Sequence, residues 1–280
     1  MTAAASTSSP VSPTSPPRRA HGRGAPLPSW VLGVLGIVGF LATWELVVRS
    51  GLVEAEYLPA ASAVLREIAE LAGTSEFWAA LGRTVRTWAI GLAIAASAAV
   101  VVGLVIGPSR FLRRATHSTI EFLRPIPSVA LIPLAVLLYG TSMQSTLLLV
   151  VYAAFWQVLI QVLYGVGDVD PVASDTARSF GLGALARIRH LTWPTALPYV
   201  MTGLRLGAAV ALILTVTGEL VIGGGGIGTE IALANSGGAV PQMYALVVVA
   251  GLIGVVVNLV ARVVERRALH WHVSVRREAL

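Results

Sequence analysis

Side chains that could bind a charged partner are scarce in this sequence of 280 residues, and their densest group is the polar segment 170–200, which lies between two apolar stretches. The acidic and basic residues of this polar segment are Asp170, Asp175, Arg178, Arg187, Arg189 and His190. Two kinds of binding suit such a segment: contact with lipid headgroups, or docking of a soluble protein. The residue types alone leave both alternatives open.

Outside the polar segment, the chain lacks the groups of residues that catalysis or ion coupling would require. The chain has no cysteine, which excludes disulfides and thiolate metal sites. Only His270 and His272 are histidines close in sequence, and no carboxylate pattern accompanies them, so we expect no metal site. A membrane-embedded enzyme needs His, Asp or Ser clustered at one depth. An ion-coupled carrier needs carboxylates in mid-span, and only Glu45 and Glu219 meet that requirement even loosely.

The composition indicates a membrane protein. Hydrophobic residues make up 55% of the chain and charged residues only 12%, whereas soluble domains carry roughly 25% charged residues. The mean hydropathy of +0.77 agrees. All basic residues are arginines, and they lie in short segments between apolar blocks. That pattern is typical of loops beside a membrane, and it argues against a continuous nucleic-acid-binding face.

We therefore expect an all-α membrane protein with about six transmembrane helices, since a bilayer core requires about 20 apolar residues per helix. The expected spans are residues 30–48, 88–106, 122–139, 145–163, 201–222 and 244–264. The third span contains three prolines, which interrupt the backbone hydrogen bonds and need compensation from neighbouring groups.

The organisation along the chain follows from these spans. We expect a disordered cytoplasmic tail (1–29), a first transmembrane helix (30–50), an outer loop (51–87) with an amphipathic helix over 61–81, a core (88–264) that includes a cytoplasmic loop (165–200), and a cytoplasmic tail (265–280). Arginines are frequent in 107–118, in 164–200 and in both tails, and absent from 140–144 and 223–243. Because arginine-rich loops stay in the cytoplasm, both termini and the polar segment are predicted to be cytoplasmic.

Local signals predict two short helices in the polar segment. Asp170 is a good N-cap, and Pro171 suits the first helical position. A first helix is expected to reach about Phe180, after which Gly181 provides the left-handed residue that commonly ends helices. A second helix starts near Gly183 and is limited by Pro194, and Pro198 is expected to prevent its continuation into the next span.

The same residues resemble a known motif, the cytoplasmic "EAA" loop in the permease subunits of bacterial ABC importers. The motif places Glu-Ala-Ala, three residues, Gly, nine residues, Ile, any residue and Leu-Pro in order. This chain has Asp175-Thr176-Ala177, then Gly181, then Leu191 and Trp193-Pro194 at the same spacing. Glu is replaced by Asp, the first Ala by Thr, Ile by Leu, and the Leu before Pro by Trp.

Further runs resemble the branch of this family that transports nitrate, sulfonates and taurine. They are "ALPYVMTGLRLG", "GGGGIGTEI", "LRPIPSVALIPLAVLLYG" and "YLPAASAVLREIAEL". Together they extend over roughly residues 55–267. The resemblance implies the permease fold of type I ABC importers, in the bacterial inner or plasma membrane, and import of a small solute such as a sulfonate, taurine or nitrate.

The resemblance also implies partners. A helix formed by Asp175, Thr176, Ala177, Arg178 and Ser179 would enter a cleft of a separate ATPase subunit, with Gly181 allowing the turn that follows and Pro194 ending the motif. The chain has no lysine and no phosphate-binding loop, so it would bind no cofactor itself, and ATP and Mg²⁺ would lie on the ATPase. A second permease copy, as a homodimer, and an extracytoplasmic solute-binding protein would complete the assembly.

Polar residues within the expected spans are the remaining candidates. Glu219 either lines the translocation path or reaches the interface, and Gln157 either faces the path or bonds to a neighbouring helix. Arg205 lies near the cytoplasmic end of its span and is expected to extend toward the interface. Glu121 and Arg124 are one helical step apart and are expected to form an ion pair.

Overall fold

The computed structural model describes residues 28–54 and 56–271, and all regular elements in that part of the chain are helical. The helices are α1 (Ser29–Arg49), α2 (Ala61–Ala72), α3 (Ser75–Ile106), α4 (Arg110–Leu123), η1 (Ser128–Leu131), α5 (Ile132–Tyr139), α6 (Met143–Gly167), α7 (Pro171–Ser179), α8 (Ala184–Arg187), η2 (Ile188–Thr192), α9 (Trp193–Ile222), α10 (Ile227–Ser236) and α11 (Val240–Ala268). The expected N-terminal tail lies outside the described residues up to residue 27, as does the C-terminal tail from residue 272.

Five of these helical stretches are long and apolar enough to cross a membrane: α1, α3, α6, the stretch from α8 to α9, and α11. Each of them contains one of the expected spans other than the third. The third is wrong as a single helix, because α4 and the η1–α5 arm meet at an angle of 81°. Pro125 and Pro127 lie at this bend. Neither proline donates a backbone hydrogen bond, and this loss favours a break in the helix here.

The amphipathic helix expected over 61–81 is shorter than predicted. It is α2, and it ends at Ala72, before Gly73 and Thr74. Thr74 then caps α3, because its hydroxyl oxygen accepts a hydrogen bond from the amide of Phe77 at 3.4 Å. This cap starts α3 at Ser75, so the second membrane-spanning helix begins well before residue 88.

The centre of the bundle is formed by α3, α6 and α9, which approach each other through glycines. A Cβ atom at Gly165 of α6 would lie 2.8 Å from the Cα of Ala196 in α9, and one at Gly203 of α9 would lie 2.9 Å from the Cβ of Gln161. In lipid, burial of apolar surface gives little driving force between helices, and close backbone packing through small residues replaces it. These glycines therefore set the spacing of the central helices.

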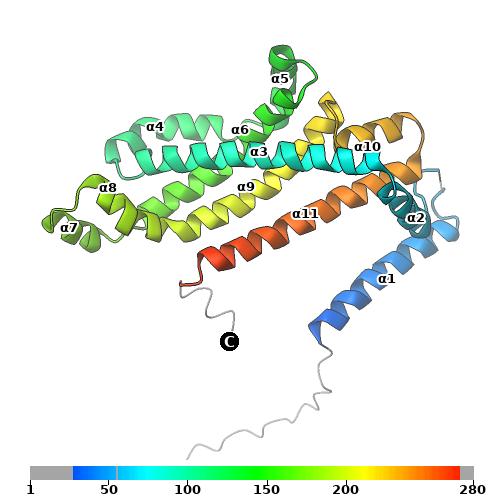
Figure 1. Cartoon of the computed structure of the whole chain (residues 1–280), viewed down its shortest axis with the longest axis horizontal. Coiled ribbons are helices and arrows are strands. Elements are labelled where there is room, and N and C mark those ends of the chain that lie inside the picture. Colours follow the sequence, from blue (N-terminus) through cyan, green and yellow to red (C-terminus); the bar gives the residue numbers. More distant parts are fainter. Residues whose placement is uncertain (1–27, 55, 272–280) are drawn as a thin grey trace, which may run out of the picture.

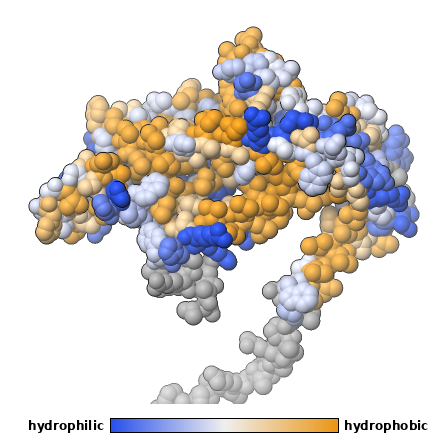
Figure 2. All heavy atoms as spheres, in the orientation of Figure 1, coloured by the Kyte–Doolittle hydropathy of each residue, from blue (hydrophilic) through white to orange (hydrophobic). Residues whose placement is uncertain are grey.

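Figure 1 shows α3, α6, α9 and α11 running lengthwise, with α7 and α8 at one end and α2 and α10 at the other. α5 projects away from these helices, and α1 diverges from them. In Figure 2 apolar atoms cover much of the length of the helices, while hydrophilic atoms gather around α2 and at the end of α11. This distribution is what a bilayer requires of a protein that spans it.

Candidate functional site

The first helix of the polar segment forms as the sequence predicts. Asp170 caps α7, and its Oδ1 accepts a hydrogen bond from the amide of Val172 at 2.9 Å. Pro171 occupies the first helical position, where its missing amide hydrogen is not needed. α7 ends at Ser179 without a single buried residue. The cap therefore stabilises a helix that the rest of the chain hardly covers.

Gly181 ends this helix in the left-handed conformation, with φ of +72°. Its amide donates to the carbonyl of Arg178 at 2.9 Å, and the amide of Leu182 donates to the carbonyl of Ala177 at 3.0 Å. No atom of the described residues lies within 4 Å of the position that a Cβ of Gly181 would occupy. The backbone conformation alone therefore requires glycine here, as predicted.

The expected proline break after the second helix is wrong. α8, the π-helical turn η2 and α9 form one helical stretch from Ala184 to Ile222. Pro194 lies in the first turn of α9, directly after η2, and Pro198 lies inside α9. A π turn changes the backbone bonding pattern, and the hydroxyl of Thr195 donates to the carbonyl of Leu191 at 2.8 Å. Such adjustments satisfy the backbone groups that prolines leave free in membrane helices.

The surface of α7 and α8 combines charge with exposed apolar side chains. Asp175 and Arg178 form an exposed ion pair at 3.7 Å, which contributes little to stability. Phe180 and Leu185 are 81% and 80% exposed. Thr176 and Ser179 are also exposed, and Ala177 and Pro194 are half-buried. Exposed apolar residues of this size on a projecting element mark a surface that is suited to contact.

A cavity of about 480 Å³ lies between α7, α8 and the turn that precedes α4. Its arginines are Arg110, Arg113, Arg178 and Arg187. The cavity replaces packed side chains on the inner side of α7. α7 has no buried residue and lies at one end of the molecule, so it projects from the bundle as a knob (Figure 1).

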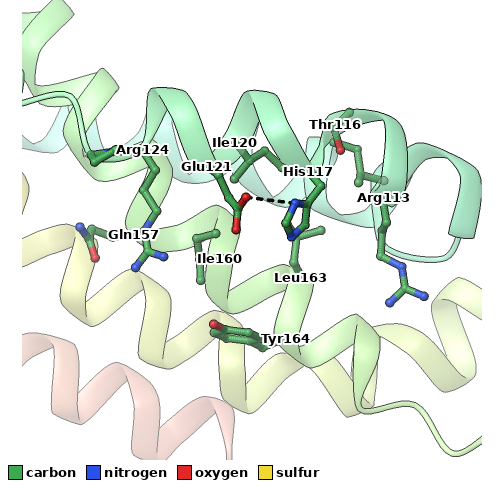
Figure 3. Close-up of a pocket in the computed structure, with 12 residues that line it drawn as sticks. Arg113, Thr116, His117, Ile120, Glu121, Arg124, Gln157, Ile160, Leu163 and Tyr164 are labelled. Atoms are coloured by element: carbon green, nitrogen blue, oxygen red, sulfur yellow. Dashed lines mark ion pairs between the residues drawn. The ribbon is translucent and has the colours of Figure 1, made fainter.

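A second cavity, of about 560 Å³, lies between α4 and α6 and contains the predicted Gln157 (Figure 3). We call it the α4–α6 cavity. Its polar lining residues are Arg113, Thr116, His117, Glu121, Arg124, Gln157 and Tyr164. The structure does not bring Gln157 together with the polar residues of α7, because the two lie at different cavities.

The ion pair expected between Glu121 and Arg124 is wrong. Oε2 of Glu121 lies 3.2 Å from Nδ1 of His117, four residues earlier on α4 (Figure 3). Helix α4 ends at Leu123, so Arg124 lies where the chain turns toward α5. The sequence spacing allowed either partner for the glutamate, and the direction of the chain after α4 decided between them.

Glu219 is 2% exposed and belongs to a buried group that we call the Glu219 cluster: Thr84, Glu219, Ile227 and Gly228. Its Oε2 accepts from the hydroxyl of Thr84 at 2.8 Å and from the amide of Gly228 at 3.1 Å. The hydroxyl oxygen of Thr84 in turn accepts from the amide of Ile227 at 2.8 Å. The cluster thereby joins α3, α9 and α10. A role for Glu219 in a pathway stays a prediction.

The glycines before α10 make room for this cluster. Gly223, Gly224, Gly225 and Gly226 all have positive φ angles, between 89° and 107°. A Cβ atom at Gly226 would overlap the carboxyl group of Glu219. Sequence reasoning missed Thr84, because a lone threonine on an apolar helix gives no sign of its distant partner.

Arg205 reaches toward α11. Its Nε donates to Oδ1 of Asn258 at 3.3 Å, and its NH1 lies 3.7 Å from Oε2 of Glu265.

Within residues 28–54 and 56–271 no group of three or more His, Cys, Asp or Glu side chains could hold a metal ion.

Comparison with known proteins places these features in context. Residues 99–270 match the protein family described as "Binding-protein-dependent transport system inner membrane component". The chain is 30% identical over 250 residues to the taurine transport system permease protein TauC of Escherichia coli (strain K12), which covers 88% of this chain and 90% of the relative. It is 26% identical over 245 residues to the putative aliphatic sulfonates transport permease protein SsuC of Bacillus subtilis (strain 168), which covers 88% and 89%.

A solved structure shares the fold. It is that of a bacterial ABC transporter involved in the import of the acidic polysaccharide alginate, with a TM-score of 0.60 and 15% identity. The alignment covers 85% of this chain and 96% of the solved chain. At this level of identity the likeness concerns the helical arrangement alone.

Proposed function

Because the chain belongs to the family of inner membrane components of binding-protein-dependent transport systems, we propose that it imports a small sulfonate, taurine or nitrate-like solute, driven by a separate ATPase subunit. The chain is an integral membrane permease. The relatives of the sulfonate and taurine systems support the choice of solute. ATP and Mg²⁺ would lie on the ATPase, and this chain would bind no cofactor.

The observation that carries the proposal is the projecting helix α7. It is capped by Asp170 and followed by the left-handed Gly181, and Phe180 directly after it and Leu185 of α8 are exposed to solvent. We infer that the ATPase receives this knob, with the segment 175–179 entering its cleft. Apolar side chains would supply most of the contact area, and the charges of Asp175 and Arg178 would set the orientation.

The orientation and the assembly follow from the same proposal. The end that carries α7 would face the cytoplasm, together with both termini and the arginines at the end of α11. A second copy of the chain would complete the translocation path as a homodimer. Two observations support a second copy: the η1–α5 arm bends by 81° away from the direction of α4, and its residues Leu134, Leu137 and Leu138 are exposed. A solute-binding protein would deliver the solute at the opposite end.

Replacing Gly181 by leucine tests the docking role. Leucine at φ of +72° costs about 1–2 kcal/mol. In the free protein the loop can relax, so docking would have to impose the strained conformation again. We expect the affinity for the ATPase to fall roughly 5- to 30-fold, with uptake reduced and the protein still in the membrane. Asp175→Arg should act in the same direction through charge reversal.

Gly183→Leu is the matched control. Gly183 lies two residues away in the same loop, but its φ of −61° suits any residue, and no atom in the part of the chain that the structure describes lies within 4 Å of its Cβ position. Co-purification of the ATPase and uptake in proteoliposomes are the measurements. If the Gly181 variant still retains the ATPase and transports like the Gly183 variant, the docking assignment is wrong.

A further inference from the structure

One face of α4 carries a stripe of polar side chains. Arg113, His117, Glu121 and Arg124 follow each other at intervals of four, four and three residues and line the α4–α6 cavity (Figure 3). Residues at this spacing lie on the same side of a helix. At a rise of about 1.5 Å per residue, the two arginines are about 16 Å apart along the helix axis. The stripe therefore runs along the cavity and has a cation at each end.

The cationic groups of this stripe exceed its carboxylates. Glu121 is the one acidic lining residue, and it pairs with His117. Among residues 28–54 and 56–271, neither Arg113 nor Arg124 has an ion-pair or side-chain hydrogen-bond partner. Figure 3 shows the guanidinium of Arg124 extending toward the space beside Gln157. The donors of the guanidinium and of the amide are thus available to an anion.

The remaining lining is apolar. It consists of Ile106, Ile120, Pro125, Ile160 and Leu163. A cavity of about 560 Å³ lies in the size range of small-molecule sites. An inorganic anion would use the arginines and leave this apolar lining unoccupied. An oxyanion attached to a short alkyl chain would use both kinds of lining.

Such a molecule could be a transported solute or a membrane lipid, and the depth of the cavity in the membrane distinguishes between the two. Gln157 precedes Gly167, the end of α6, by ten residues, which corresponds to about 15 Å along the helix. A lipid headgroup stays near the membrane interface. It could meet Arg113, which lies close to the start of α4, but not Gln157 and Arg124 at the far end. A solute that crosses the membrane must pass both depths.

We propose that the α4–α6 cavity is a binding site for the transported solute within the membrane, that the solute is an organic oxyanion with a short alkyl chain, and that Arg124 and Gln157 hold its anionic head. The site rests on the proposed import function. Arg113 would be the next cationic position along the stripe toward the end that carries α7. Ile160 and Leu163 would contact the alkyl chain.

The test measures binding of butane-1-sulfonate to the purified permease–ATPase complex in nanodiscs that contain no anionic lipid. Arg124→Gln removes a charged donor, so the affinity should fall roughly 10- to 100-fold. Gln157→Leu removes a neutral donor and should cost roughly 2- to 10-fold. Arg114→Gln is the control, because Arg114 is exposed on α4 but does not line the cavity. It should stay within about 2-fold of the unmodified protein.

Chain length provides a second measurement. From methanesulfonate to butane-1-sulfonate, affinity should rise roughly 4-fold per added methylene, because each buried methylene contributes about 0.8 kcal/mol. Nitrate should bind more weakly than butane-1-sulfonate, and butylammonium should not compete. Equal affinities of the Arg124 and Arg114 variants, or no dependence on chain length, would overturn the proposal.

Two further outcomes separate the alternatives. If Arg124→Gln abolishes stabilisation by phosphatidylglycerol and leaves butane-1-sulfonate binding unchanged, the cavity is a lipid site and the proposal fails. If the binding pattern holds but the complex hydrolyses ATP without taking up any anion in the presence of its binding protein, the site stands and the import function is wrong.

Discussion

Replacing Thr84 by valine tests whether the Glu219 cluster holds α3, α9 and α10 together. Valine has nearly the same shape, but it can neither donate to the carboxylate of Glu219 nor accept from the amide of Ile227, both at 2.8 Å. Within the described part of the chain Oε1 of Glu219 already has no hydrogen-bond partner, so the buried carboxylate would keep only the amide of Gly228. Interhelical hydrogen bonds in membranes contribute about 0.6 kcal/mol on average and up to about 1.7. Two lost bonds should therefore lower the free energy of unfolding by about 1–3 kcal/mol.

Thr87→Val is the control for this change. Thr87 is buried on the same helix, but its hydroxyl donates to the carbonyl of Arg83, one turn earlier in α3. Its loss should cost less than about 0.6 kcal/mol. Unfolding by sodium dodecyl sulfate in mixed micelles, followed by circular dichroism, measures both variants. Equal destabilisation by the two substitutions would refute the role of the cluster as an interhelical tie.

Two other predictions concern helix spacing and orientation. Gly165→Ala places a methyl group 2.8 Å from the Cα of Ala196 and should destabilise the protein by about 1–3 kcal/mol. Gly39→Ala is the control, because no described atom lies within 4 Å of its Cβ position, and it should be neutral or stabilise α1 by up to about 1 kcal/mol. Thermal unfolding in detergent compares the two variants, and equal midpoints would contradict close packing of α6 on α9. The chain has no native cysteine, so a single introduced cysteine can be labelled selectively. In intact cells Ser179→Cys should resist an impermeant thiol reagent, whereas Ser236→Cys should react. Labelling of Ser179→Cys from outside would contradict the proposed topology.

Local signals in the sequence were sufficient to predict the structure of the polar segment up to its second helix. The cap at Asp170, the proline after it and the left-handed Gly181 each act within a few residues, so their effect does not depend on distant packing. The spans were predictable for a related reason, because the bilayer imposes the same length and apolarity on every helix that crosses it. The start of α3 was missed, although the short cap at Thr74 is itself a local signal.

Features that depend on distant neighbours required the tertiary structure. The prolines predicted a break at Pro194 and Pro198, but the helix continued through a π turn that lies directly before Trp193 and Pro194. At Pro125, between α4 and η1, the chain instead turned by 81°. Proline removes a backbone donor at every such position, and whether a helix bends or continues depends on the groups around it.

The sequence by itself determined the membrane class, most of the spans and the capped helix with its left-handed glycine, because each follows from solvent or from bonds between near neighbours. Only the tertiary structure decided which partner Glu121 takes, that Glu219 lies between Thr84 and Gly228, and that Gln157 shares a cavity with Arg124. These outcomes rest on contacts between helices far apart in the chain. Several pairings satisfy the same spacing in the sequence, and packing selects one of them.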